Sequence, residues 1–374
     1  IGGTIIMELI DKYVWYQEGP GVRKNQYTSS GVKLLNVANL VEGKIELSTS
    51  SRYISEDEAN GRYNHFLVDE GDLIIASSGI QVSYFEKKMG IAEKKHLPLC
   101  MNTSTIRFKV LDKKIMDIRY FMYFLKSNLF KNQIRRLITG SAQLNFGPSH
   151  LKKIKIEVPE LKKQQEIVKK LDRVKKIIDI RNNQIIELNE LIKSQFVEMF
   201  GNIHFNDRKW NKNKWRDVLI IKNGKNQKKV ESFNGKYPIY GSGGIIGFAN
   251  DYICNENSII IGRKGSINKP ILVKTKFWNV DTAFGVEPIK EKIKADYLYY
   301  FCCFYNFEKH NKAVTIPSLT KKDLLNIEIS VPPIDLQNQF SEIVKQIDKQ
   351  KFEIEKSLKE TQELYESLME KYFG

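Results

Sequence analysis

The sequence predicts an α/β (α+β) protein in which two globular domains alternate with two long antiparallel coiled-coil helices, giving a pseudo-twofold internal repeat. Three observations predict this architecture. One segment occurs twice at an offset of 173 positions, each copy carries a heptad pattern of apolar residues, and the segments between contain short β-rich runs separated by glycine-rich turns. Self-similarity at a fixed offset indicates a duplicated architecture before any single residue is interpreted.

The first globular segment is expected at residues 1–150 and the second at residues 205–322. Short β-rich runs at 72–77 and 258–262 are bounded by Gly, Asn and Ser, which is typical of strands joined by turns. Each segment closes with an aromatic, helix-like stretch, at 118–125 and at 296–301. Aromatic residues at helical spacing indicate a buried core face more often than a platform for stacked bases.

Helical regions are expected at residues 151–204 and 323–374. Each begins with a matching strand-like segment that ends in Val-Pro, and each ends in Phe-Gly. Between these landmarks apolar residues recur in alternating steps of four and three, which predicts coiled-coil helices. Each would be roughly 60 Å long, at about 1.5 Å per residue. The two seams are Ile167, Leu171, Val174, Ile178, Arg181, Ile185, Leu188, Ile192, Gln195, Met199 and Phe340, Val344, Ile347, Lys351, Ile354, Leu358, Thr361, Tyr365, Leu368, Tyr372.

Polar residues interrupt both seams, at Arg181 and Gln195 in the first and at Lys351 and Thr361 in the second. Such residues either fix the register of the pair or extend their polar ends to solvent from half-exposed positions, and the sequence leaves both open. The simplest packing places the two helices against each other within one chain. Homodimerisation through either helix is the alternative.

The composition favours an anionic partner. Sixty Lys and Arg residues against 44 Asp and Glu residues give a net charge of +16, which favours DNA or RNA first and an anionic membrane second. Codon bias is the alternative explanation of this charge. No run of about 18 apolar residues occurs, so no membrane span is expected. The four cysteines lack Cys-x-x-Cys spacing, so a reduced, cytoplasmic protein without structural zinc is expected.

The candidate DNA-contacting residues lie in turns of both globular segments. Residues 71–79 correspond loosely to residues 257–265, and in each a buried strand ends in a glycine-bearing turn. Arginine can bind guanine O6 and N7, while Lys and Ser contact phosphates. For any single residue, a solvated basic turn is the simpler interpretation. The candidates are Arg23, Lys24, Ser77, Ser78, Gly79, Lys225, Asn226, Gln227, Ser242, Gly243, Arg263, Lys264, Ser266, Asn268 and Lys269.

The catalytic motifs are absent. The chain has no Gly-x-x-x-x-Gly-Lys-Ser/Thr loop, no Asn/Asp-Pro-Pro-Tyr/Phe methylation motif and no Gly-x-Ser-x-Gly elbow, and its five histidines lack metal-ligand spacing. Three hypotheses follow: a DNA-recognition scaffold, a stand-alone DNA methyltransferase or nuclease with a cryptic active site, and a coiled-coil interaction protein whose charge is incidental.

Over its whole length the chain resembles the specificity (S) subunit of type I restriction–modification systems. The resemblance is carried by residues 141–146, by the paired entries 158–161 and 331–334, by 336–340, and by 240–247 together with 261–267. Residues 1–150 and 205–322 would then be target recognition domains, and 151–204 and 323–374 the conserved helical regions. From the resemblance, a fuller leading segment is expected before the first recognition domain.

The resemblance implies a non-catalytic subunit that reads a bipartite target in double-stranded DNA, one half-site per recognition domain. The antiparallel helices would act as a spacer between the half-sites. Two methyltransferase subunits would use S-adenosylmethionine, and restriction subunits would use ATP and Mg²⁺, so no cofactor is expected on this chain. No contact with a membrane is implied.

Overall fold

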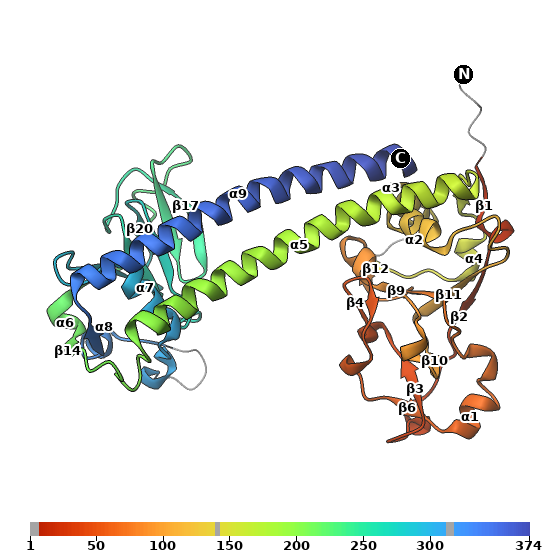
Figure 1. Ribbon diagram of the computed structural model, residues 1–374, viewed down its shortest axis with the longest axis horizontal. Coiled ribbons are helices and arrows are strands. Elements are labelled where there is room, and N and C mark those ends of the chain that lie inside the picture. Colours follow the sequence, from red (N-terminus) through yellow and green to blue (C-terminus); the bar gives the residue numbers. More distant parts are fainter. Residues whose placement is uncertain (1–6, 139–142, 312–317) are drawn as a thin grey trace. The chain divides into compact units, whose positions relative to one another are not determined.

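The computed structural model describes residues 7–138, 143–311 and 318–374. The chain divides into two compact units: unit 1 comprises Ile1–Asp179 and Lys359–Gly374, and unit 2 comprises Ile180–Leu358. Of the stretch 141–146 that carried part of the resemblance, residues 141 and 142 lie outside the described residues. Both long helices are divided between the units. Figure 1 labels the helices and strands of the chain.

Unit 1 is built from short strands and four short helices, followed by the first long helix. Its strands are β1 (Glu8–Leu9), β2 (Val14–Glu18), β3 (Val32–Leu35), β4 (Leu40–Val41), β5 (Lys44–Ile45), β6 (Tyr53–Ile54), β7 (Leu73–Ala76), β8 (Ile80–Gln81), β9 (Met89–Ile91), β10 (Leu99–Met101), β11 (Thr105–Val110), β12 (Gln143–Leu144) and β13 (Lys155–Ile156). Its helices are α1 (Glu56–Asn60), α2 (Ile118–Lys126), α3 (Asn128–Leu137), α4 (Pro148–Leu151) and the first part of α5 (Leu161–Phe200).

Unit 2 repeats this plan with fewer strands. They are β14 (Asn211–Lys214), β15 (Leu219–Asn223), β16 (Tyr237–Gly241), β17 (Gly244–Ala249), β18 (Ser258–Gly262), β19 (Ile271–Val273), β20 (Trp278–Asn279), β21 (Ala283–Pro288) and β22 (Glu328–Val331). The helices are α6 (Trp215–Val218), α7 (Ala295–Phe304), α8 (Lys321–Leu325) and α9 (Ile334–Phe373), whose last part belongs to unit 1.

The duplication extends through both globular parts. Each unit has a four-stranded sheet, in the order β2-β11-β7-β9 in unit 1 and β15-β21-β18-β19 in unit 2. Each also has a three-stranded sheet whose central strand, β3 or β16, has a parallel neighbour on one side and an antiparallel neighbour on the other. The registers agree as well, since Arg107 lies opposite Ile74 as Gly285 lies opposite Ile260. The looser correspondence read from the sequence is therefore a structural repeat.

The buried strands and aromatic helices form the cores that the sequence predicts. Strands β7 and β18 are buried along their whole length, because each lies inside its sheet with both faces covered. Helix α2 contributes Tyr120, Phe121 and Phe124 to the core of unit 1, and α7 contributes Tyr297 and Phe301 to that of unit 2. The prediction that these aromatic stretches are core helices is confirmed.

The long helices pack in opposite directions within each unit. In unit 1, Leu171 near the start of α5 shares a core with Phe373 at the end of α9. In unit 2, Phe196 near the end of α5 packs against Phe340 near the start of α9. All residues of the predicted seams are buried or half-buried, which confirms the heptad interpretation.

Two of the polar seam residues make hydrogen bonds between the helices of unit 2. Arg181 Nη1 donates to the carbonyl oxygen of Ser357 (2.6 Å), and Lys351 Nζ donates to Oδ1 of Asn189 (2.7 Å). A cation held by an acceptor on the facing helix favours one register over its neighbours. Of the two interpretations left open by the sequence, these contacts favour register selection for Arg181 and Lys351.

A buried glutamine joins the start of α5 to the globular part of unit 1. The side chain of Gln164 is fully buried. Its Oε1 accepts a hydrogen bond from the N–H of Asp117, the N-cap of α2, at 2.9 Å, and its Nε2 donates to the carbonyl oxygens of Ile115 and Pro159, both at 2.7 Å. One amide therefore satisfies three backbone groups that burial would otherwise leave without partners.

Gln337 makes the same contacts at the start of α9. Its Oε1 accepts from the N–H of Lys294, the N-cap of α7, at 2.8 Å, and its Nε2 donates to the carbonyl oxygens of Lys292 (3.2 Å) and Pro332 (2.8 Å). The two glutamines are related by the 173-residue offset. This repeated contact ties the start of each long helix to its globular part.

We expect Gln164→Leu and Gln337→Leu each to lower the free energy of unfolding by about 1–3 kcal/mol, because leucine leaves a buried N–H and two buried carbonyl groups without partners. Denaturant unfolding of the full chain measures this. The matched control is Gln165→Leu, at the exposed neighbouring position, which should change stability little. Equal losses for Gln164→Leu and Gln165→Leu would contradict the role assigned to the buried amide.

Candidate nucleic-acid interface

In unit 2, three segments that are separate in the sequence meet around one loop, residues 280–282. A β-carbon built on Gly224 would lie 1.8 Å from the carbonyl oxygen of Val280, so the chain at Gly224 lies directly against this loop and requires glycine. The N–H of Arg263 donates to the carbonyl oxygen of Thr282 (2.8 Å), which joins the turn after β18 to the same loop. The loop cluster of unit 2 consists of residues 224–227, 241–244, 262–266 and 280–282.

The turn between β16 and β17 reaches the turn after β18. A β-carbon built on Gly262 would lie 3.2 Å from Cβ of Ser242, and one on Gly241 would lie 3.7–3.9 Å from the side chains of Ile246, Val280 and Thr282. The small residues Gly241, Ser242 and Gly262 let these turns approach each other. The loop 280–282, which both turns approach, connects β20 of the three-stranded sheet to β21 of the four-stranded sheet.

Eight of the candidate residues lie in this cluster. Exposed members are Lys225, Asn226, Gly243, Arg263 and Lys264, and half-buried members are Gln227, Ser242 and Ser266. None of the ion pairs found within the described residues involves Lys225, Arg263 or Lys264. Their charges are thus available to an anionic ligand, as the sequence interpretation requires.

Asn268 and Lys269 follow the cluster along the chain. Asn268 Nδ2 donates to Asn306 Oδ1 (3.0 Å) and its Oδ1 accepts from the N–H of Phe307 (2.8 Å), so its amide holds two parts of unit 2 together. Lys269 is exposed. Asn268 therefore has a structural role in this arrangement, whereas Lys269 extends the basic surface.

Unit 1 forms the same frame with different side chains. The N–H of Ser77 donates to the carbonyl oxygen of Ser104 (2.9 Å), in the place of the bond between Arg263 and Thr282. Ser77 itself is 1% exposed, so its side chain is part of the interior and is not available to a ligand. Ser78 Oγ (2.7 Å) and the N–H of Gly79 (3.0 Å) both donate to Asn145 Oδ1.

The basic candidates of unit 1 lie in the segment that follows β2. Arg23 and Lys24 are exposed. The segment is held by the N–H of Val22, which donates to Asn102 Oδ1 (3.3 Å), and by Gly19, where a β-carbon would lie 2.0 Å from the carbonyl oxygen of Asn102. Gly19 thus matches Gly224 of unit 2. The two units place basic side chains on equivalent loops, but the residues themselves differ.

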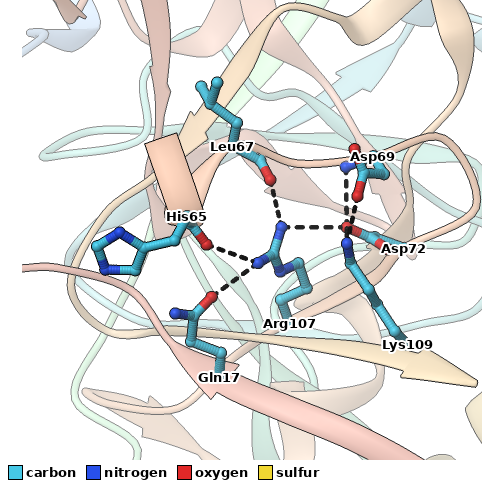
Figure 2. Close-up of polar contacts among 7 residues, drawn as sticks. All are labelled: Gln17, His65, Leu67, Asp69, Asp72, Arg107 and Lys109. Carbon is cyan, nitrogen blue, oxygen red and sulfur yellow. Dashed lines mark hydrogen bonds and ion pairs between the residues drawn. The ribbon is translucent and has the colours of Figure 1, made fainter. Parts of the chain in front are cut away.

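A buried ion pair supports the loops of unit 1, and the sequence interpretation missed it. Arg107 is 3% exposed, and its Nη1 lies 3.4 Å from Asp72 Oδ2. Figure 2 shows the guanidinium also donating to Gln17 Oε1 (2.7 Å) and to the carbonyl oxygens of His65 (2.9 Å) and Leu67. Arg107 therefore ties β11 to β2 and to the chain before β7.

Burial raises the pKa of the Asp72 carboxyl above its ordinary value, against the lowering effects of the Asp69 N–H and the cations of Lys109 and Arg107. Lys109 pairs with Asp69 and lies 3.9 Å from Asp72. Strong pKa shifts often mark functional sites, but buried ion-pair networks shift pKa values too. Here every partner is structural, so this network supports the fold.

The described residues contain no group of three or more His, Cys, Asp or Glu side chains arranged to hold a metal ion. In the same part of the chain, no helix combines the length and apolar character that a membrane crossing requires.

The sequence of this chain is similar to those of known proteins. The family model of the type I restriction modification DNA specificity domain matches residues 21–190 and 207–364. The putative type I restriction enzyme MjaX specificity subunit of Methanocaldococcus jannaschii is 22% identical over 96% of this chain and 92% of its own length. The MjaVIII specificity subunit of the same organism is 27% identical over 45% of this chain, an alignment that spans 39% of that protein.

The fold is also found among solved structures. The type I restriction-modification S subunit from M. genitalium matches with a TM-score of 0.62 and 18% identity, covering 100% of this chain and 98% of that one. A structure described as concerning complex assembly and conformational transition of the type I R-M system matches with a TM-score of 0.59 and 17% identity, covering 98% and 97% of the two chains. At these identities the likeness shows a common fold.

Proposed function

This chain belongs to the type I restriction modification DNA specificity family, and we propose that it recognises a bipartite DNA target as the specificity subunit of such a system. The observation that carries the proposal is the duplicated loop cluster. Two units with the same frame but different exposed side chains suit two half-sites of different sequence. A pseudo-twofold protein suits half-sites about one helical turn apart, roughly 34 Å.

Within this proposal, residues 1–150 and 205–322 read the half-sites, and the paired helices set the distance between them. The exposed candidates of the two units supply phosphate contacts and base-edge donors. The register contacts of Arg181 and Lys351 support a spacer of defined length, because they oppose sliding of one helix along the other.

The chain would act without a catalytic site of its own, in the cytoplasm. Methyltransferase subunits, two per specificity subunit, would supply S-adenosylmethionine chemistry, and restriction subunits would supply ATP- and Mg²⁺-dependent cleavage. Incubating the purified chain with DNA and S-adenosylmethionine, or with Mg²⁺, tests this division. Turnover by the chain alone would contradict it and favour a stand-alone DNA-modifying enzyme.

The loop cluster of unit 2 is expected to contribute to the salt dependence of DNA affinity. We expect the triple variant Lys225→Ala, Arg263→Ala, Lys264→Ala to bind duplex DNA more weakly at low salt. The slope of log K against log salt should fall by about 2–3, because each lost phosphate contact removes about 0.9. Fluorescence anisotropy across a salt series measures both quantities.

The control for this experiment removes the same charge elsewhere. Lys345, Lys349 and Lys356 are exposed on α9 in the same unit, and their replacement by alanine should leave the slope close to that of the unchanged chain. If both triple variants lowered the slope equally, net charge would explain the binding, and the loop cluster would have no special part in it.

A further inference from the structure

The edge hairpin of unit 2 exposes apolar side chains. Phe233 is 99% exposed, Ile245 is 56% exposed and Ile246 is 55% exposed, and Phe248 is exposed too. The N–H of Ser232 donates to the carbonyl oxygen of Phe248, which places the turn containing Phe233 beside β17. Several large apolar side chains exposed on one element of a folded protein point to a binding surface.

A β-bulge explains why both isoleucines are exposed. Neighbouring side chains of a regular strand point to opposite faces, so one of the pair would normally be covered. Here Ile239 lies opposite Gly247 and Tyr240 opposite Ile245, which leaves Ile246 as an extra residue without a partner. Bulges redirect side chains and are frequent beside functional sites. The side chain of Ile246 lies beside the loop cluster, with its Cγ2 3.7 Å from a β-carbon built on Gly241.

The charges around this hairpin favour DNA as the partner. The hairpin tip adjoins the turn that carries Arg263 and Lys264, and Lys225 lies on the third segment of the same cluster. These cations form no ion pair within the described residues. Exposed isoleucines beside cations without carboxylate partners match a ligand that carries both negative charges and apolar groups.

The major groove of DNA is such a surface. It admits a two-stranded β-ribbon, and the 5-methyl group of thymine is its apolar feature. The hairpin β16–β17 is one edge of a three-stranded sheet, in which β20 pairs with β16 at Ile239 and Tyr240. Its tip, with a two-residue turn at Ser242 and Gly243, lies beyond these paired positions and has only two strands. In unit 1 the corresponding edge strand is β6, which pairs with β3 at only two positions, so the two units differ in this element.

We propose that the β16–β17 hairpin enters the major groove and that Ile245 and Ile246 recognise thymine through its 5-methyl group. The inference rests on the proposed function, since it assigns a reading element to one half-site. Arg263 and Lys264 then hold the adjacent phosphates. Removing the isoleucines should change which bases are preferred, whereas removing the cations should weaken binding to all sequences.

The test begins with selection of random-sequence duplexes by the full chain. The unchanged chain should enrich two half-sites. The variant Ile245→Ala, Ile246→Ala should lose base preference at thymine positions of one half-site and keep the other half-site unchanged. The matched control is Ile220→Ala, an exposed isoleucine of β15 outside the hairpin, which should enrich the same two half-sites as the unchanged chain.

The second step removes the methyl groups from the DNA. Replacing the thymines of that half-site by deoxyuridine should weaken binding of the unchanged chain about fourfold for each methyl group contacted, from about 0.8 kcal/mol per buried carbon. The same replacement should leave the DNA affinity of the Ile245→Ala, Ile246→Ala variant unchanged. That variant lacks the side chains that contact the methyl groups, so the two losses do not add. Thermal unfolding of the variant, expected to be unchanged, shows that the fold is kept.

Three outcomes would overturn the inference. An unaltered base preference in the isoleucine variant would exclude the hairpin from readout and leave its apolar surface to a protein partner. Equal weakening on all duplexes would mean that the isoleucines contact DNA without reading it. If the unchanged chain enriched no sequence at all, the proposed function itself would fail, which is a different result from either of the others.

Discussion

Replacing Arg107 by leucine is expected to lower the free energy of unfolding of this protein by about 3–5 kcal/mol, because removing one partner of a buried ion pair is strongly destabilising. The variant leaves the buried Asp72 carboxylate with only the Asp69 N–H and the Lys109 ammonium at 3.9 Å. It also removes the donor from Gln17 Oε1 and from the carbonyl groups of His65 and Leu67. Typical domains are stable by only 5–15 kcal/mol, so unit 1 would be close to unfolding.

The loss should depend on pH in a defined direction. Burial already raises the pKa of Asp72 in the folded protein, and loss of the arginine cation would raise this pKa further. A carboxyl with a raised pKa binds its proton more tightly when folded, so its unfavourable effect on stability grows as pH rises through the folded pKa. Arg107→Leu should therefore be most destabilising near neutral pH and less so in acid. Denaturant unfolding at several pH values measures this.

Unit 2 suggests the rescue experiment. At the positions equivalent to Asp72 and Arg107 it carries Ser258 and Gly285, and a β-carbon on Gly285 would lie 2.1 Å from the Cys254 sulfur. Unit 2 therefore lacks both the carboxylate and the guanidinium of this ion pair. The double variant Arg107→Leu, Asp72→Leu should recover part of the stability that Arg107→Leu loses. A double variant as unstable as the single one would show that the carboxylate is not the cause.

Lengthening both long helices by one heptad is expected to change the recognised DNA sequence. Duplicating residues 182–188 of α5 and 351–357 of α9 adds about 10 Å at about 1.5 Å per residue. This corresponds to roughly three base pairs at about 3.4 Å each. The contacts of Arg181 with Ser357 and of Lys351 with Asn189 bracket these two segments, so the insertions face each other.

The longer chain should enrich a target whose unspecified spacer is about three base pairs longer, and its affinity for the original target should fall to the non-specific level, a loss of about 10³-fold or more. Random-duplex selection with both chains measures this. Duplication in α9 alone is the control, because it disrupts the pairing and should abolish specific binding. A functional double insertion that kept the original spacer would refute the role of the helices as a spacer.

Much of the architecture follows from periodicity in the sequence. The seam from Ile167 to Met199 predicts a long helix because apolar residues at steps of four and three can be buried along only one face. The same holds for the seam from Phe340 to Tyr372. The aromatic stretches at 118–125 and 296–301 were recognisable as core helices for the same reason, and burial of Tyr120 and Tyr297 agrees.

The candidate site was only partly predictable. Lys225, Arg263 and Lys264 are visible in the sequence as basic turns, but their convergence on residues 280–282 depends on the order and register of the sheets. The sequence also predicts Ser77 as a DNA-contacting residue, and this prediction is wrong because the Ser77 side chain is buried. Burial of this serine depends on contacts with residues far away in the sequence. One feature of the sequence points to Gln164 and Gln337, which is that they are related by the 173-residue offset. The two heptad seams do not predict that either glutamine is buried.

The sequence by itself therefore determined the order of globular parts and long helices, the seam of each helix and the duplication, because these depend on local periodicity and on an offset that can be counted. Only the tertiary structure decided which loops form a cluster, that Arg107 and Asp72 share an interior site, and that a bulge exposes Ile246. These depend on strand pairing between residues far apart in the chain, where the shift of a single residue moves every side chain to the opposite face.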